Sequence, residues 1–123
     1  MTFDERENKR TKPRRNLYFY LKVVDEVTEQ QIGRVVDLTT SGMMLINEAP
    51  FEVGSTHNAK IILSGDLFDL TMSDISVSFT TQWTKPDINP SYFVNGLKFK
   101  DLTQKAFRTI EQVIRKFSFE EEN

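Results

Sequence analysis

The feature that most constrains the fold is a strict alternation of side-chain character between residues 75 and 83. One set of alternate positions holds Ile75, Val77, Phe79, Thr81 and Trp83, and the positions between them hold Ser76, Ser78, Thr80 and Gln82. Successive side chains of a β-strand point to opposite faces, so this pattern predicts a strand with one buried face. We therefore expect Trp83 to lie in the core.

Similar short segments recur along the chain and predict further strands. They are 17–23, 32–39, 43–46, 59–63, 67–72 and 92–99, separated by polar or proline-containing stretches at 25–31, 47–54 and 85–90. The segment at 67–72 is expected to form a hairpin with 59–63. Six or seven short strands joined by local turns favour an antiparallel barrel or a strongly curled sheet.

The C-terminal segment predicts one amphipathic helix, within residues 101–119. Its apolar positions fall on one helical face: Leu102, Ala106, Ile110, Val113, Ile114 and Phe117. We expect Asp101 to cap the helix, with Gln104 completing a capping box. The pattern leaves open whether the helix closes the barrel, covers a sheet face or pairs with another chain. Phe107, Phe117 and Phe119 suit either a homodimer contact or the barrel floor.

Composition argues against catalysis and against a metal site. The chain has no cysteine and one histidine, His57, which we expect on a surface loop. A Ser-His-Asp arrangement would have to be built on His57 alone, although we expect this residue on a surface loop. Asp66, Asp69 and Asp74 lack the spacing of a calcium loop. We therefore expect a non-enzymatic protein that binds neither metal nor cofactor.

Two further features bear on location. The sequence contains no run near the roughly 20 apolar residues that a membrane-spanning helix needs. Its first residues, Met1 to Glu5, lack the apolar segment of a secretory signal. We expect no membrane insertion, and a cytoplasmic location is the default.

A basic cluster lies near the N-terminus. Five of the seven residues from Lys9 to Arg15 are Lys or Arg. Residues 1–16 carry few large apolar groups, so they cannot bury enough surface to offset their conformational entropy. Pro13 favours an extended backbone around it. We interpret 1–16 as a flexible basic arm, ahead of a barrel at 17–100.

The segment Asp37–Gly42 is the second candidate functional stretch. In an extended chain, Asp37 and Thr39 share one face, and Gly42 lets another group approach the backbone closely. A carboxylate and a hydroxyl side by side suit a polar ligand. The alternative is a turn in which Asp37 caps backbone amides.

Together these motifs resemble the PilZ domain. The motifs are the R-x-x-x-R of Arg10–Arg14, the D-x-T-x-x-G of Asp37–Gly42, a tryptophan strand at Trp83, and a G-hydrophobic-x-F at Gly96–Phe99. The resemblance covers about residues 10–117. Either short motif alone is weak, and their ordered combination is much more specific.

The resemblance implies a six-stranded antiparallel barrel that binds the bacterial second messenger cyclic di-GMP. In this family the arm wraps the ligand and the strand-turn supports it. Arg10 and Arg14 would hold phosphates and guanine edges, Asp37 would accept from guanine, Thr39 would supply a hydroxyl, and Gly42 would open the backbone. Lys9, Arg15 and Ser41 are possible secondary contacts. Lys9 replaces an arginine common in the family, which favours one bound ligand over an intercalated pair.

Ordering the arm is expected to carry the signal. Fixing seven backbone residues costs about 7–14 kcal/mol, comparable to several charge-assisted hydrogen bonds. The arm should thus be loose when empty and ordered toward an unidentified partner protein when filled. The alternative is a PilZ-like adaptor that binds no nucleotide and acts in pilus or surface-structure assembly. A nucleic-acid partner is disfavoured because the net charge is −2 and no aromatic residue alternates with the basic ones.

Overall fold

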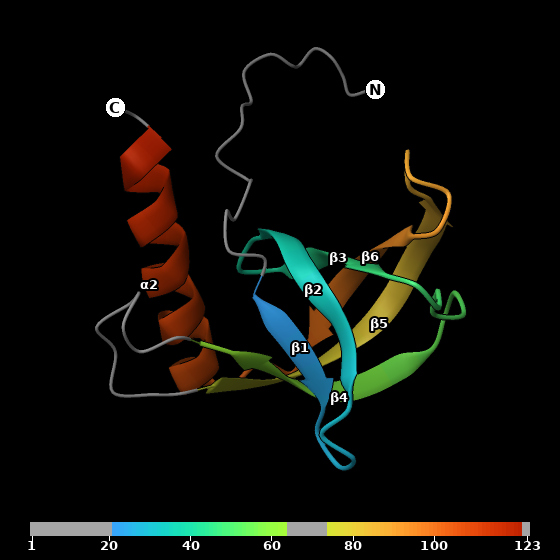
Figure 1. The fold of residues 1–123 in the computed structure, drawn as a ribbon. Helices are drawn as coiled ribbons and strands as arrows, with labels where there is room; N and C mark the ends of the chain where they lie inside the picture. Colours follow the sequence, from blue (N-terminus) through green and yellow to red (C-terminus); the bar gives the residue numbers. More distant parts are fainter. Residues whose placement is uncertain (1–20, 64–73, 122–123) are drawn as a thin grey trace.

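The computed structural model describes residues 21–63 and 74–121, with side chains to residue 116. It contains six strands followed by one helix (Figure 1). The strands are β1 (Lys22–Asp25), β2 (Gln31–Leu38), β3 (Gly42–Asn47), β4 (Thr56–Ile62), β5 (Asp74–Pro86) and β6 (Phe93–Lys100). The predicted arm at 1–16, the start of the first predicted strand and the predicted strand at 67–72 lie outside the described residues.

The strands form one closed barrel, in the order β1-β2-β3-β6-β5-β4. Every neighbouring pair is antiparallel, and β4 pairs with β1 to close the sheet. This confirms the predicted six-stranded antiparallel barrel with a C-terminal helix.

The core fills the barrel with the inward positions of the strands. Phe79, Leu45, Ile61 and Ile75 are all completely buried. On β5 the predicted alternation holds through Thr81, which is also buried. It then fails, because Trp83 is 39% exposed. The prediction that Trp83 lies in the core is wrong, and its cause is a β-bulge described below.

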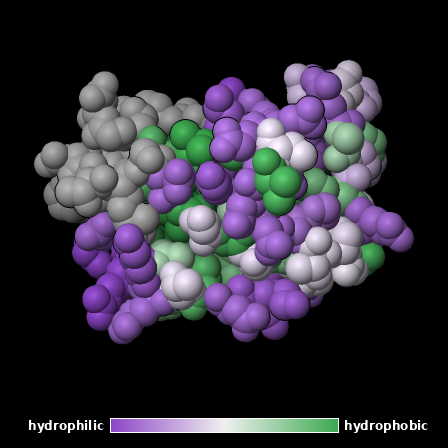
Figure 2. All heavy atoms as spheres, turned by 90° about the horizontal axis from the view of Figure 1, so that it is seen from below, coloured by the Kyte–Doolittle hydropathy of each residue, from purple (hydrophilic) through white to green (hydrophobic). Residues whose placement is uncertain are grey.

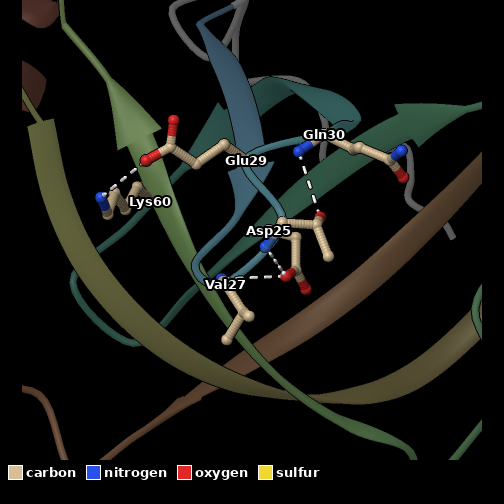
Figure 3. A network of polar contacts seen from close by, with 6 residues as sticks. Asp25, Val27, Glu29, Gln30 and Lys60 are labelled. Carbon is tan, nitrogen blue, oxygen red and sulfur yellow. Dashed lines mark hydrogen bonds and ion pairs between the residues drawn. The ribbon is translucent and has the colours of Figure 1, made fainter.

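The turn between β1 and β2 is held by Asp25 (Figure 3). One carboxylate oxygen, Oδ2, accepts hydrogen bonds from the backbone N–H groups of Thr28 at 2.9 Å and Val27 at 3.0 Å. These two bonds, led by that of Thr28, stabilise the charged form and lower the pKa of Asp25. In the same turn, Glu29 Oε2 forms an ion pair with Lys60 Nζ on β4 at 3.9 Å.

The β3–β4 loop is fastened to the barrel by the completely buried Asn95. Its Oδ1 accepts from the backbone N–H of Phe51 at 3.1 Å. Its Nδ2 donates to Leu45 O and to Asn47 Oδ1, each at 3.1 Å. Phe51 packs against the core.

His57 lies on β4 and is half-buried. Its ring centroid is 4.5 Å from that of Phe51 and 5.5 Å from that of Phe79. Its Nε2 lies 3.0 Å from Ser55 Oγ. The expectation of a surface-loop histidine is therefore wrong, because pairing with β5 extends β4 back to Thr56.

The predicted loop at 85–90 begins later than expected. Lys85 and Pro86 still pair with Val94 and Phe93, so β5 runs to Pro86. Proline has no backbone N–H to donate to the sheet, and it is tolerated here because Pro86 is the last residue of the strand.

The helix α2 (Gln104–Glu121) packs its first half on the barrel core. Its lower end lies beside the start of β5 in Figure 1. Ala106, Ile110 and Val113, which belong to the predicted apolar face, are buried in the core cluster, so the helix covers the barrel. The N-cap is Thr103, whose Oγ1 accepts from Ala106 N at 3.0 Å. The predicted cap, Asp101, instead has a positive φ of 51°, because the chain turns there as it leaves β6.

The described surface is mostly hydrophilic on the face shown in Figure 2. The large apolar side chains that remain exposed in this part of the chain are Val27, Val53, Trp83, Ile88 and Phe107. Phe107 is thus not part of the barrel floor. Across residues 21–63 and 74–121, no helix combines the length and apolar character required to span a membrane.

Candidate ligand-binding site

An open pocket of about 370 Å³ lies on the outer wall of the barrel, beside the β2–β3 turn. Its size falls within the range of small-molecule sites. It is lined by Asp37, Thr39, Ser41, Gly42, Met43, Met44, Gln82, Trp83, Gly96, Leu97 and Lys98. The structure thus brings together four of the predicted site residues. The other four, Lys9, Arg10, Arg14 and Arg15, lie outside the described part of the chain.

A β-bulge in β2 directs Asp37 out of the barrel. Val35 pairs with Leu45 but Asp37 pairs with Met44, which leaves Val36 as an extra residue. Val35 is buried, and strict alternation would have turned Asp37 inward as well. The extra residue shifts the in–out alternation of β2 by one position, so Asp37 is half-buried and borders the pocket.

The Asp37 carboxylate also contributes to the turn. Its Oδ1 accepts from the backbone N–H of Leu38 at 2.9 Å. This is the backbone contact expected from the turn interpretation, and the same side chain lines the pocket. The two interpretations of Asp37 are therefore compatible.

The hydroxyl of Thr39 holds the turn together. Its Oγ1 accepts from the N–H groups of Gly42 at 3.1 Å and Ser41 at 3.2 Å. It also lies 3.2 Å from both Gly42 O and Ser41 Oγ. This pattern is an ST-type turn. Thr39 therefore has a structural role that the sequence motif alone did not reveal.

Gly42 lets strand β6 come close to the turn. A Cβ added at Gly42 would lie 2.1 Å from the carbonyl oxygen of Leu97. The predicted close approach to the backbone is thus made by the protein's own β6. Phe99 N also donates to Ser41 O at 2.9 Å, so the turn is fixed to β6 at two points.

A second β-bulge, in β5, turns Trp83 into the pocket. Thr81 pairs with Leu97 but Trp83 pairs with Gly96, which leaves Gln82 as the extra residue. The indole ring lies directly over Gly96, where an added Cβ would be 2.2 Å from its Cε2 and Nε1 atoms. Lys85 Nζ lies 5.4 Å from the centre of the same ring.

Sequence reasoning missed Trp83 and Lys98 as pocket residues. The alternating sequence of β5 does not reveal that Gln82 is an extra residue, so it predicts Trp83 in the core. One signal was present, because a glycine within a strand, here Gly96, often marks a close approach of another group. No sequence feature indicated Lys98, which occupies the unspecified position of the G-hydrophobic-x-F motif.

This arrangement defines a class of protein: a small antiparallel β-barrel domain with a polar and aromatic pocket on its outer wall and one C-terminal helix. Among the described side chains, no cluster of three or more His, Cys, Asp or Glu could hold a metal ion. The sequence profile of the PilZ domain matches residues 5–116. The chain belongs to the PilZ domain family.

Solved structures support the fold. MotI/DgrA of Bacillus subtilis, an inhibitor of motility, has a TM-score of 0.68 at 11% identity, covering 84% of this chain and 49% of that one. MrkH of K. pneumonia in its apo state has a TM-score of 0.64 at 14% identity, covering 82% and 47%. The PilZ domain of YcgR from Escherichia coli, solved with c-di-GMP, has a TM-score of 0.60 at 11% identity, covering 83% of both chains.

The chain therefore spans about half the length of MrkH and MotI/DgrA. No curated protein sequence matches it. At these identities the solved structures support the fold alone.

Proposed function

We propose that this protein is a non-enzymatic receptor for cyclic di-GMP. The supporting observation is the pocket that places Asp37, the Thr39 turn and the exposed ring of Trp83 on one outer wall. The ligand contacts proposed are Arg10, Arg14, Asp37, Thr39 and Gly42, with Lys9, Arg15 and Ser41 as secondary contacts. The PilZ domain of YcgR and the K. pneumonia MrkH protein have both been solved with c-di-GMP.

The chemistry of the pocket suits a guanine dinucleotide. Cyclic di-GMP carries two guanines and two phosphates. The Asp37 carboxylate matches the N–H donor edge of guanine, and the partly exposed ring of Trp83 can stack on a base. The arginine forks of the R-x-x-x-R arm match phosphate and the O6/N7 edge of guanine.

The proposed mechanism of signalling is ordering of the arm. Residues 1–16 form the arm, 17–100 the barrel and 101–119 the helix in this proposal. Ligand binding orders the arm over the pocket and presents a new surface to a partner protein in the cytoplasm. If the arm is equally resistant to protease with and without cyclic di-GMP, this mechanism is excluded.

Calorimetric titration of the full chain with cyclic di-GMP tests the proposed function. The unaltered chain should bind saturably. Asp37→Ala and Arg14→Ala should each weaken binding by about 10–150-fold, the equivalent of one charge-assisted hydrogen bond. Matched controls are Glu48→Ala and Arg108→Ala, which remove exposed charges outside the pocket and should leave the affinity unchanged.

Absence of saturable binding by the unaltered chain would contradict the proposal. It would favour the alternative of an adaptor that works through protein contacts alone. An equal loss of affinity in the control variants would show that general charge, not the pocket, attracts the ligand.

A further inference from the structure

Lys98 is a charged residue of the pocket, and it occupies the unspecified position of the G-hydrophobic-x-F motif at Gly96–Phe99. Among the described residues that line the pocket, only Asp37 and Lys98 carry a formal charge. Lys98 is exposed on the outer face of β6, between Gly42 of β3 and Thr80 of β5. The barrel itself therefore provides a cation at the site.

The position of Lys98 is fixed by its two chain neighbours. The carbonyl oxygen of Leu97 lies 2.1 Å from the position that a Cβ at Gly42 would take. The backbone N–H of Phe99 donates to Ser41 O at 2.9 Å. Lys98 lies between these two contacts, so its backbone is held against the β2–β3 turn. Its side chain leaves the strand on the same face as Gly96, which carries the Trp83 ring.

We propose that Lys98 binds a phosphate group of cyclic di-GMP, as a contact separate from the R-x-x-x-R arm. This inference depends on the proposed function. An ammonium group is a compact point charge with three donors, which suits a phosphate oxygen. Its backbone is already ordered in a strand, so this contact does not incur the backbone entropy that ordering the arm costs.

The two charged side chains of the pocket would contact different parts of the ligand. Asp37 on β2 offers acceptors for a base, and Lys98 on β6 offers a donor for a phosphate of the same ligand. Lys98 can therefore contact a phosphate before the arm has ordered. Because the contact is exposed, dissolved salt should weaken it measurably.

The test is calorimetric titration of the full chain and three variants with cyclic di-GMP, at about 50 mM and about 300 mM salt. Lys98→Met removes the charge and keeps the aliphatic stem, whereas Lys98→Arg keeps the charge. The matched control is Lys100→Met, since Lys100 is exposed on the same face of the same strand and does not line the pocket.

We expect Lys98→Met to weaken binding about 5–30-fold at low salt and by less at high salt. Lys98→Arg should restore most of the affinity, and Lys100→Met should match the unaltered chain. The urea midpoints of all four proteins should agree, because the side chain is exposed.

Three results would overturn the inference. In the first, Lys98→Met and Lys100→Met bind cyclic di-GMP with equal affinity and the unaltered chain still binds it. This result would leave the proposed function intact. Another is a loss that is equal at both salt concentrations or accompanied by a lower urea midpoint, which would assign Lys98 a packing role. The third is no binding by the unaltered chain, which overturns the proposed function as well.

Discussion

Asp37 on β2 and Trp83 on β5 line the same pocket, and each directly follows the extra residue of a β-bulge. Without the two bulges, strict alternation from the buried Val35 and Thr81 would turn both side chains into the barrel. Two local irregularities therefore build the polar and the aromatic parts of one site. The regular part of the barrel supplies the rigid support for both.

Trp83→Ala is expected to weaken cyclic di-GMP binding about 5–150-fold, because base stacking on an aromatic side chain contributes about 1–3 kcal/mol. Trp83→Phe should retain part of the affinity. Phe107→Ala is the matched control, since Phe107 has the same 39% exposure and lies on α2, outside the pocket. Calorimetry would contradict the prediction if Trp83→Ala and Phe107→Ala bound equally well.

Gly96→Ala is expected to destabilise the protein by about 1–3 kcal/mol, the usual range for overpacking. The added Cβ would lie 2.2 Å from the Trp83 ring, so the ring must move. In a Trp83→Ala background much of this cost should disappear, because the obstructing ring is gone. Urea unfolding of both single variants and the double variant measures the coupling. Additive free energies of unfolding would show that Gly96 is required for another reason.

Asn95→Leu is expected to lower the free energy of unfolding by about 3 kcal/mol. The change removes the hydrogen bonds that the Asn95 side chain makes with Phe51 N and Leu45 O inside the protein. Asn89→Leu, in the exposed β5–β6 loop, should cost less than about 1 kcal/mol. Hydrogen exchange should also show faster exchange of the Phe51 amide. Similar urea curves for the two variants would be inconsistent with this role.

Asp25→Asn tests the pH dependence of stability. The backbone N–H groups of Thr28 and Val27 lower the pKa of Asp25 in the folded protein, so its charge stabilises the fold above its ordinary pKa. We expect the unaltered chain to be the more stable at about pH 7, and the difference to shrink as pH falls from about 4 through the lowered pKa.

Urea unfolding across this pH range measures the Asp25 effect. Glu29→Gln in the same turn is the control, because Glu29 is 72% exposed and its ion pair with Lys60 contributes little. A constant difference between Asp25→Asn and the unaltered chain at every pH would rule out a contribution from the charge.

The barrel could be predicted from sequence because its strands are encoded locally. The alternation around Phe79 and the polar stretch between β1 and β2 each occupy a few consecutive residues. The turn at Asp37–Gly42 could also be found, since its acid, hydroxyl and glycine stand at fixed spacing. These features need no knowledge of distant parts of the chain.

The side-chain directions at the site could not be predicted in this way. Trp83 was expected in the core because the extra residue at Gln82 is visible only when β5 is paired with β6. The cap of α2 was expected at Asp101 and lies at Thr103, because the helix begins only after the chain has left the barrel. Both features depend on contacts between segments that are separate in the sequence.

Closure of the barrel limits how this domain can engage other proteins. Within the described residues, each strand has hydrogen-bonded neighbours on both sides. A strand segment that is paired on both sides offers no open edge for β-augmentation, in which a peptide adds itself to a sheet. Recognition of this part of the molecule must instead depend on side chains displayed by the wall, the loops or the helix.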